Sequence, residues 1–244
     1  MMKTVLFLTV VLSATALELP SIIKPCARSD PKVLECVANS ARDTVVSLAK
    51  GLKSFKILPL EPLEINNLEI GANDGSVALK QEYQNVKIYG LTKNLQVYDY
   101  QINWDKLIFT SRSYNPRVDF TADYKLDGRV LLLPIRGEGK CNISMHDLVS
   151  THDIRFETFE KDGDTYMRAK KYITKFIPKH VTLNFDNLFN GQRAIGEQLT
   201  KFFADNADII FQEFAGPYAE TFGIVFTKIT NDIFTRVPMS KIFK

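Results

Sequence analysis

The spacing of apolar residues near the start of the chain predicts an amphipathic helix. Between Asp30 and Gly51 the apolar residues recur at steps of three and four, which is the spacing of one helix face. Asp30 as the N-cap and Pro31 at the first helical position would begin this helix, and Gly51 would end it. The residues of the apolar face are Leu34, Val37, Ala41, Val45, Leu48 and Leu52.

The middle of the chain, from Leu63 to about Phe185, alternates apolar and polar residues as β-strands do. The alternation is clearest in Gln96–Asn103, Val118–Leu126 and Ile154–Phe159. Because one side of each strand is apolar and the other polar, we expect an antiparallel sheet that is covered on one face.

Two short segments bear on how these strands connect. Lys161-Asp162-Gly163-Asp164 is typical of a tight hairpin turn. Asp127-Gly128 has two interpretations, because Asp-Gly favours a hairpin turn, yet the alternation continues through it to Val130 and Leu132. A turn and a bend within one long strand both remain open at this position.

The residues from Gly191 to Arg236 return to a helical pattern that Gly216-Pro217 interrupts. An unbroken helix of this length would extend about 69 Å, whereas a compact globule of this size is about 45 Å across. The apolar stripe advances by about 3.8 residues per step and so drifts around the helix, which favours a sheet rolled around it. The alternative is two helices that meet at Pro217, because proline kinks helices. The stripe comprises Ile195, Leu199, Phe203, Ala207, Ile210, Phe214, Tyr218, Phe222, Val225, Ile229 and Ile233.

A leader precedes this folded region. Lys3 stands before an apolar run over Val5–Leu12, and small residues follow at Ser13–Ala16. This order is typical of a secretory signal peptide, residues 1–16, cleaved after Ala16. A membrane span needs roughly 20 apolar residues, more than this run contains. We therefore expect a secreted, extracellular protein whose mature chain, residues 17–244, forms a single domain.

Composition and charge exclude several function classes. The chain of 244 residues is 45% hydrophobic and 24% charged, which is typical of a folded globular protein. Its net charge of +3 is too small to argue for nucleic-acid binding. We expect no nucleic-acid partner, no stable membrane insertion and a monomeric protein.

Secretion changes the interpretation of the three cysteines, because an oxidising compartment lets thiols pair. A bridge between Cys26 and Cys36, ten positions apart, would contribute about 2.5–3 kcal/mol by the chain-entropy argument. Cys141 is then a buried free thiol or one half of an intermolecular bridge. Asn142-Ile143-Ser144 is a glycosylation sequon, which would place Asn142 on the surface.

An ordered set of segments resembles one family of proteins. After the leader come the cysteine pair around Asp30-Pro31, Pro59–Ile65 (PLEPLEI), Asp123–Gly139 (DYKLDGRVLLLPIRGEG), Leu188–Gly191 (LFNG) and Val237-Pro238. In this order, over roughly Pro25 to Phe243, the chain resembles the insect takeout and juvenile hormone-binding protein family.

The resemblance implies an α+β, tubular lipid-binding fold. A long curved antiparallel sheet wraps around a long C-terminal helix and encloses an apolar tunnel, with the amphipathic helix at the N-terminus. It also implies the Cys26–Cys36 bridge, no catalytic residues, and a setting in insect haemolymph or sensory secretions with effects on feeding, circadian output or reproduction. Hormone-binding members carry a second disulfide, for which Cys141 has no partner, so the chain resembles the takeout branch more closely.

Candidate catalytic and metal sites are weak. The spacing of His146 and His152 fits no common zinc pattern, and we predict that both lie on a wet surface. Ser150–Asp153 holds the residue types of a catalytic triad without a nucleophile elbow. The basic residues Arg168, Lys170, Lys171 and Lys175 predict a solvated strand face, with weak attraction to anionic membranes as the alternative.

We therefore expect binding without catalysis, metal or cofactor. Sites for small apolar ligands are concave and mostly apolar, and we expect a carrier of a terpenoid, a juvenile-hormone-like molecule or a long-chain fatty acid. The alternatives are an extracellular signalling or interaction protein with a filled core, and a hydrolase that uses His152. Candidate residues of the tunnel wall are Trp104, Phe120, Tyr124, Val130, Leu132, Phe203, Ile210, Phe214, Phe222 and Val225, of which Trp104 and Tyr124 would offer polar tips to a head group.

Overall fold

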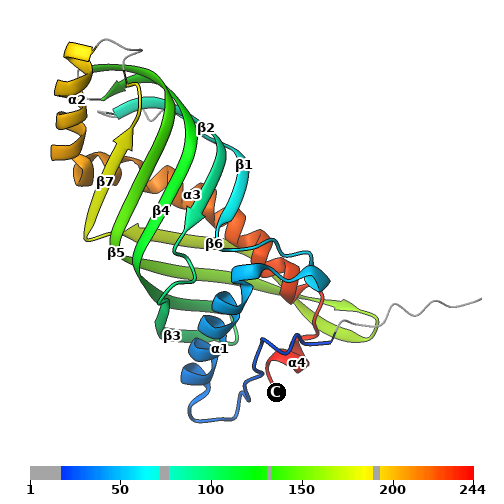
Figure 1. The fold of residues 1–244 in the computed structure, drawn as a ribbon. Coiled ribbons are helices and arrows are strands. Elements are labelled where there is room, and N and C mark those ends of the chain that lie inside the picture. Colours follow the sequence, from blue (N-terminus) through cyan, green and yellow to red (C-terminus); the bar gives the residue numbers. More distant parts are fainter. Residues whose placement is uncertain (1–17, 72–76, 131–132, 189–192) are drawn as a thin grey trace, which may run out of the picture.

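Seven antiparallel strands form one curved sheet in the part of the chain that the computed structural model describes, residues 18–71, 77–130, 133–188 and 193–244 (Figure 1). The predicted signal peptide, residues 1–16, lies outside these ranges. The strands are β1 (Leu63–Ile70), β2 (Val77–Tyr89), β3 (Gln96–Asn103), β4 (Ile108–Val130), β5 (Leu133–Lys161), β6 (Asp164–Ile177) and β7 (His180–Phe185). The sheet therefore occupies the region where the sequence alternates.

The two longest strands, β4 and β5, join two halves of the sheet. Toward the β4–β5 connection, β4 pairs with β2 and β5 with β7, whereas toward the other end β4 pairs with β3 and β5 with β6. The halves meet at Pro116 and Asp147, which are left out of the pairing. Asn115 is buried before this point and Val118 after it. The inward face of β4 thus passes from odd to even residue numbers at an irregularity where proline has no amide to donate.

The two turn segments have different structures. At Lys161–Asp164, Asp162 and Gly163 both have positive φ, 52° and 84°, so the predicted hairpin is confirmed. Gly128 instead lies inside β4, opposite Leu79 and Ile135, so one long strand is the correct interpretation there. A Cβ at Gly128 would lie 2.1 Å from the Ala78 carbonyl oxygen, which leaves room only for glycine.

The N-terminal helix α1 (Val33–Ser47) continues into a short 3₁₀ turn, η1 (Leu48–Lys50), and ends at Gly51, which has a φ of 73°. The predicted start of this helix is wrong by two positions, because the N-cap is Lys32 and the first helical residue is Val33, not Asp30 and Pro31. The Asp30 carboxylate accepts the backbone N–H of Lys32 at 2.8 Å, within the turn that precedes the helix. Leu34, expected on the buried face, is 39% exposed, and the α1 residues that line the interior cavity begin at Val37. A second 3₁₀ turn, η2 (Lys53–Phe55), precedes β1.

The C-terminal helical region breaks at a residue that the sequence pattern did not indicate. It consists of α2 (Arg193–Asp205) and α3 (Ala207–Phe234), and the short helix α4 (Met239–Ile242) follows. The break lies at Asn206, whose side-chain amide donates to the Phe202 carbonyl at 2.8 Å and so competes with helical hydrogen bonding. Pro217 lies inside α3, so neither the unbroken helix nor the break at Pro217 is correct. Because Gly216 has no Cβ, the steric clash between a proline ring and the side chain of the preceding residue does not arise at Pro217.

Helix α3 lies directly against the sheet, chiefly on β6 (Figure 1). The amide of Asn231 forms two hydrogen bonds with the backbone of Ala169, accepting its N–H at 2.7 Å and donating to its carbonyl at 3.0 Å. A Cβ at Gly223 would lie 2.4 Å from the Tyr172 carbonyl oxygen, so the helix and strand backbones approach closely there. The fold is the predicted α+β arrangement, with α1 near one end and α2 near the other.

The N-terminal segment is fastened to both α1 and the C-terminus. The disulfide Cys26–Cys36 links it to α1. Cys26 also donates its backbone N–H to Ile242 at 3.0 Å and accepts that of Lys244 at 2.9 Å. The disulfide and these hydrogen bonds therefore join the N-terminal segment to α1 and to the C-terminal residues.

Candidate functional site

An internal cavity of about 320 Å³ lies between the inner face of the sheet, α1 and α3. Its wall is mainly aliphatic and aromatic. From α1 come Val37, Ala41, Val45 and Leu48; from the strands Ile88, Val97, Phe109, Val118, Phe120, Ile143, Met145, Leu148, Ile154, Phe156 and Phe176; and from α3 Phe211, Phe222, Phe226, Ile229, Ile233 and Phe234. A cavity of this size and composition is typical of sites for small apolar ligands.

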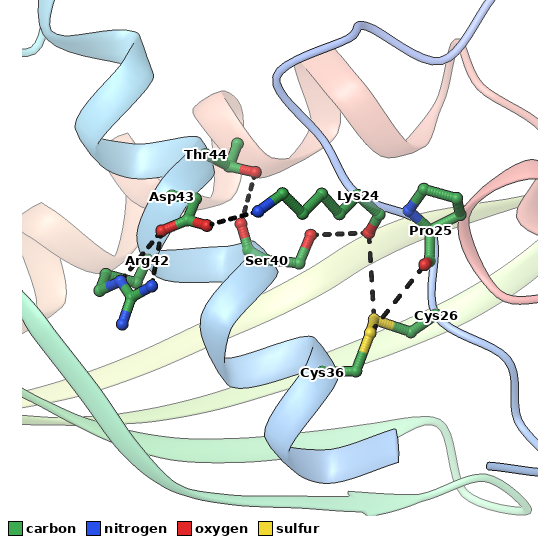
Figure 2. A network of polar contacts seen from close by, with 8 residues as sticks. All are labelled: Lys24, Pro25, Cys26, Cys36, Ser40, Arg42, Asp43 and Thr44. Atoms are coloured by element: carbon green, nitrogen blue, oxygen red, sulfur yellow. Dashed lines mark hydrogen bonds and ion pairs between the residues drawn. A yellow bond between two sulfur atoms is a disulfide. The ribbon is translucent and has the colours of Figure 1, made fainter. Parts of the chain in front are cut away.

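The N-terminal segment forms one edge of the cavity, where Ile23 and Lys24 contribute to the wall. Figure 2 shows the Lys24 side chain reaching across α1 to Asp43, and their charged groups are 3.3 Å apart. Ser40 donates its hydroxyl to the Lys24 carbonyl at 2.8 Å. Hydrogen bonds from Arg42 and Lys24 lower the pKa of the partly exposed Asp43 carboxyl. These contacts and the disulfide hold the segment over α1.

His152 lies in the cavity wall, so the prediction of a wet surface position for it is wrong. Its Nε2 is 2.9 Å from the Ser113 hydroxyl and its Nδ1 is 3.0 Å from the Tyr172 hydroxyl. Burial lowers the pKa of His152 to about 4, so the imidazole is neutral at neutral pH.

The irregularity at Asp147 explains why His146 and His152 differ. In an unbroken strand, two residues six positions apart would share a face. Because Asp147 is left out of the pairing and has a φ of 47°, His146 faces outward and His152 inward. His146 stacks on the exposed His180, with ring centroids 5.9 Å apart. This local backbone feature could not be read from the alternation alone.

A second, smaller cavity of about 30 Å³ lies beyond Tyr218, whose side chain contributes to the walls of both cavities. The side-chain oxygen Oε1 of Gln81 accepts hydrogen bonds from the Tyr83 hydroxyl at 2.8 Å and from the Tyr218 hydroxyl at 2.9 Å. The two tyrosine hydroxyl oxygens are 2.7 Å apart. The Gln81 amide nitrogen is buried and has no hydrogen-bond partner among the described residues. The polar cluster of Gln81, Tyr83 and Tyr218 therefore lines the smaller cavity, and Tyr218, Ile143 and Phe211 contribute to both.

The predicted wall residues are distributed over both cavities and beyond them. Phe120 and Phe222 line the larger one. Those that line the smaller one are Phe203, Ile210 and Phe214. Trp104, Tyr124 and Val225 line neither cavity, while the Val130 side chain and all of Leu132 lie outside the described residues. Contact of any of these residues with a ligand stays a prediction.

The two polar tips expected at a head group have other partners. Trp104 packs edge-on against Phe109 and Phe243, and the Arg28 guanidinium lies 4.5 Å from its ring centre. The Tyr124 hydroxyl donates to the Asp186 carbonyl at 2.5 Å. Trp104 thus packs against the C-terminal residues that follow α4, and the Tyr124 hydroxyl links β4 to the segment after β7.

The sequence did not predict the polar residues of the cavity wall, because they interrupt the apolar pattern. Ser111, Ser113 and Asn115 occupy the inward positions of β4 in the half that pairs with β3, and they line the cavity together with Tyr100. An inward serine has the same appearance in the sequence as an outward one. The register of the sheet is what assigns them to the interior.

With this geometry in place, comparison with known proteins identifies the family. The sequence profile described as haemolymph juvenile hormone binding protein (JHBP) matches residues 5–244. The chain belongs to the JHBP family. The resemblance read from the ordered segments is therefore confirmed, and the chain is a binding protein for hydrophobic ligands rather than an enzyme.

Relatives of this JHBP-family chain include two curated proteins and one solved structure. It is 23% identical over 233 residues to the circadian clock-controlled protein daywake of Drosophila melanogaster, covering 92% of this chain and 88% of that protein. The daywake protein of Drosophila yakuba is 24% identical over 235 residues, with the same coverage. The crystal structure of Epiphyas postvittana Takeout 1 matches with a TM-score of 0.80 at 19% identity, covering 91% of this chain and all of that one. This match shows the takeout-like fold.

Other candidate sites of this JHBP-family protein have structural explanations. The four residues of the basic cluster are exposed, and Lys170 lies 3.3 Å from Glu157, so the prediction of a solvated strand face is confirmed. Across the described ranges, the acidic, histidine and cysteine side chains form no group of three that could hold a metal ion. Within the same ranges, no helix is both long enough and apolar enough to cross a membrane.

The third cysteine and the sequon lie on opposite faces of β5. Cys141 is buried and unpaired, as the first of the two alternatives expected, and burial raises the pKa of its thiol to about 12. Asn142 is partly exposed on the outer face. Ser144 of the sequon is buried and donates its hydroxyl to Asp119 at 2.5 Å. Glycosylation of Asn142 stays a prediction.

Proposed function

We propose that the protein carries a terpenoid, a juvenile-hormone-like molecule or a long-chain fatty acid in its internal cavity. The observation that supports this most directly is the cavity of about 320 Å³ with its mainly apolar wall. Each methylene buried there is worth about 0.8 kcal/mol, so a chain of about twelve carbons gains on the order of 10 kcal/mol. This gain exceeds the lower estimates of the association cost, about 4 kcal/mol.

We further infer that the protein works outside the cell. The predicted leader and the Cys26–Cys36 disulfide support secretion, because disulfides persist in oxidising compartments. Haemolymph is the setting that the family description suggests. The name of the daywake relatives supports expression under the circadian clock, which a time course of transcript abundance over a light–dark cycle would test.

The alternative of a signalling protein with a filled core fits this interior less well, because a filled core leaves no space of this size. Extraction of the purified protein with organic solvent, followed by mass spectrometry, tests the carrier proposal. Displacement of the neutral dye N-phenyl-1-naphthylamine by terpenoids and by fatty acids is the companion measurement. An empty extract together with no displacement by either class would refute the proposal.

Two adjacent residues of α1 provide a matched pair of variants. Val45 lines the cavity, whereas Val46 is 43% exposed on the outside of the same helix. Val45→Phe should reduce dye and ligand affinity at least several-fold, because the added ring occupies ligand volume. Val46→Phe makes the same chemical change outside the cavity and should leave affinity unchanged. Equal affinities for both variants would argue that the dye binds elsewhere.

A further inference from the structure

We propose that Ser113, His152 and Tyr172 form a hydrogen-bonding site for a neutral oxygen-bearing head group, such as a hydroxyl, a carbonyl, an ester or an epoxide, and that this site disfavours a carboxylate. This inference rests on the proposed carrier function and specifies which ligands the cavity selects.

The three side chains meet on the inner face of the sheet from three different strands. In β4 and β5, Ser111 is opposite His152 and Ser113 is opposite Ser150. Tyr172 of β6 lies diagonally to His152 in the neighbouring strand pair. All five residues line the cavity. The sheet register therefore gathers a polar patch within an otherwise apolar wall.

A count of hydrogen atoms shows that this group has capacity for a further partner. A neutral imidazole carries one N–H, and the two hydroxyls each carry one O–H. The two contacts, 2.9 Å to Ser113 and 3.0 Å to Tyr172, use two of these three hydrogens. With the proton on Nε2 of His152, the Ser113 hydrogen is left over, and with the proton on Nδ1 the Tyr172 hydrogen is left over. In either tautomer one hydroxyl can donate to an oxygen atom of a ligand.

The charges around the cavity favour a neutral head group. Burial holds the pKa of His152 near 4, so the imidazole offers no positive charge to a carboxylate at neutral pH. Lys24 is the only lysine or arginine among the described residues of the wall, and it lies at the edge, paired with Asp43. A carboxylate at the patch would be desolvated without a counter-charge, which is costly. A neutral oxygen avoids this cost and still accepts the spare hydrogen bond.

The test compares ligands of equal chain length on the full mature chain. Methyl dodecanoate, 1-dodecanol and dodecanoate compete with N-phenyl-1-naphthylamine at pH 7.4. We expect the ester and the alcohol to displace the dye at concentrations at least 10-fold lower than the carboxylate. Equal or tighter binding of the carboxylate would overturn the proposal.

Variants connect this preference to the named residues. The double variant Ser113→Ala with Tyr172→Phe removes both hydroxyls. It should weaken ester binding about 3- to 10-fold relative to binding of the dye, whose affinity is measured directly for each variant. Each single variant should retain part of the effect and guards against misfolding of the double variant. Tyr114→Phe is the control, because the Tyr114 hydroxyl bonds to Asp147 and Tyr114 does not line the cavity.

The outcomes separate this proposal from the carrier function. If no ligand displaces the dye and the organic extract of the protein is empty, the carrier function itself fails. If the ligands bind but the double variant keeps the full preference for the ester, the cavity is a lipid site and the role of the three residues is refuted.

Discussion

The close approach of α3 to β6 makes Gly223 a sensitive point of the fold. A Cβ at this position would lie 2.4 Å from the Tyr172 carbonyl oxygen, so helix and strand must separate by about 1 Å to reach the 3.4 Å of ordinary contact. A gap of 0.5–1 Å already loses about a quarter to a half of the dispersion energy of the atoms that line it. The aromatic contact of Phe226 with Tyr172, 5.5 Å between ring centroids, lies at this interface.

The expected free-energy change for Gly223→Ala combines two opposing effects. Alanine is favoured over glycine within a helix by about 1 kcal/mol, whereas overpacking of a close interface costs about 1–3 kcal/mol. Because the clashing atom belongs to the backbone and cannot rotate away, we expect a net loss of about 1–2 kcal/mol. Urea unfolding followed by circular dichroism measures this loss as a lower transition midpoint at an unchanged slope.

Gly216→Ala, on the same helix, is the control for this variant. A Cβ at Gly216 meets no atom within 4 Å apart from its chain neighbours. The helix-propensity gain is reduced there by crowding against Pro217, so we expect a change between zero and about 1 kcal/mol of stabilisation. A Gly223→Ala protein that is as stable as the parent, or that gains as much as Gly216→Ala, would refute the close approach.

Three further predictions concern other parts of the fold. Asn231→Ala should lower the free energy of unfolding by about 1–3 kcal/mol in urea titrations, because the buried backbone groups of Ala169 lose both partners. Replacing Cys26 and Cys36 together by alanine should lower it by about 2.5–3 kcal/mol, and dithiothreitol should destabilise the parent but not this variant. His152 should make the free energy of unfolding fall as the pH decreases from about 6.5 to about 4. The reason is that the imidazole binds a proton near pH 6.5 in the unfolded chain but only near pH 4 in the folded protein. Urea midpoints at pH 7 and pH 5 should therefore differ more for the parent than for His152→Gln.

Each of these three has a result that contradicts it. Loss of stability in Asn231→Ala no larger than that of an exposed change such as Lys228→Ala would mean that the two hydrogen bonds contribute little. Equal sensitivity of the parent and the double-alanine variant to dithiothreitol would remove the disulfide as the cause. A pH dependence that is the same with and without His152 would show that the imidazole is not protected from protonation.

Local patterns in the sequence determined most elements of the fold. The helix that ends at Gly51, the hairpin at Lys161–Asp164 and the alternation over Val118–Leu126 were all predicted, and the structure contains them. These features depend on the period of apolar residues and on the backbone freedom of glycine, which are properties of a few neighbouring residues. The apolar stripe of α3 is likewise buried in the main, for the same reason.

The position of the helix break depends on the balance between local helix propensity and tertiary packing, and the sequence does not show the packing. Pro217 is a stronger helix breaker than Asn206, yet α3 continues through Pro217, and the break lies at Asn206, between α2 and α3. Tertiary packing on β6 outweighs the local cost of the proline, because a long buried face contributes more than one lost hydrogen bond. At Asn206 the side-chain amide donates to the Phe202 carbonyl, which also accepts the backbone N–H of Asn206, and the Asn206 backbone departs from helical values with a φ of −117° and a ψ of 15°.

Patterns within the chain were sufficient to predict the class of this protein, from an alternating sheet region, an apolar C-terminal stripe and an ordered set of family segments. Which side chains line the cavity depends on contacts between distant strands. The irregularity at Pro116 and Asp147 reverses which residues face inward, and it brings His152 into the cavity beside Ser113 and Tyr172. A shift of one residue in a strand moves every later side chain to the other face. Register is set by pairing between strands distant in the chain, so a pattern read along one strand cannot supply it.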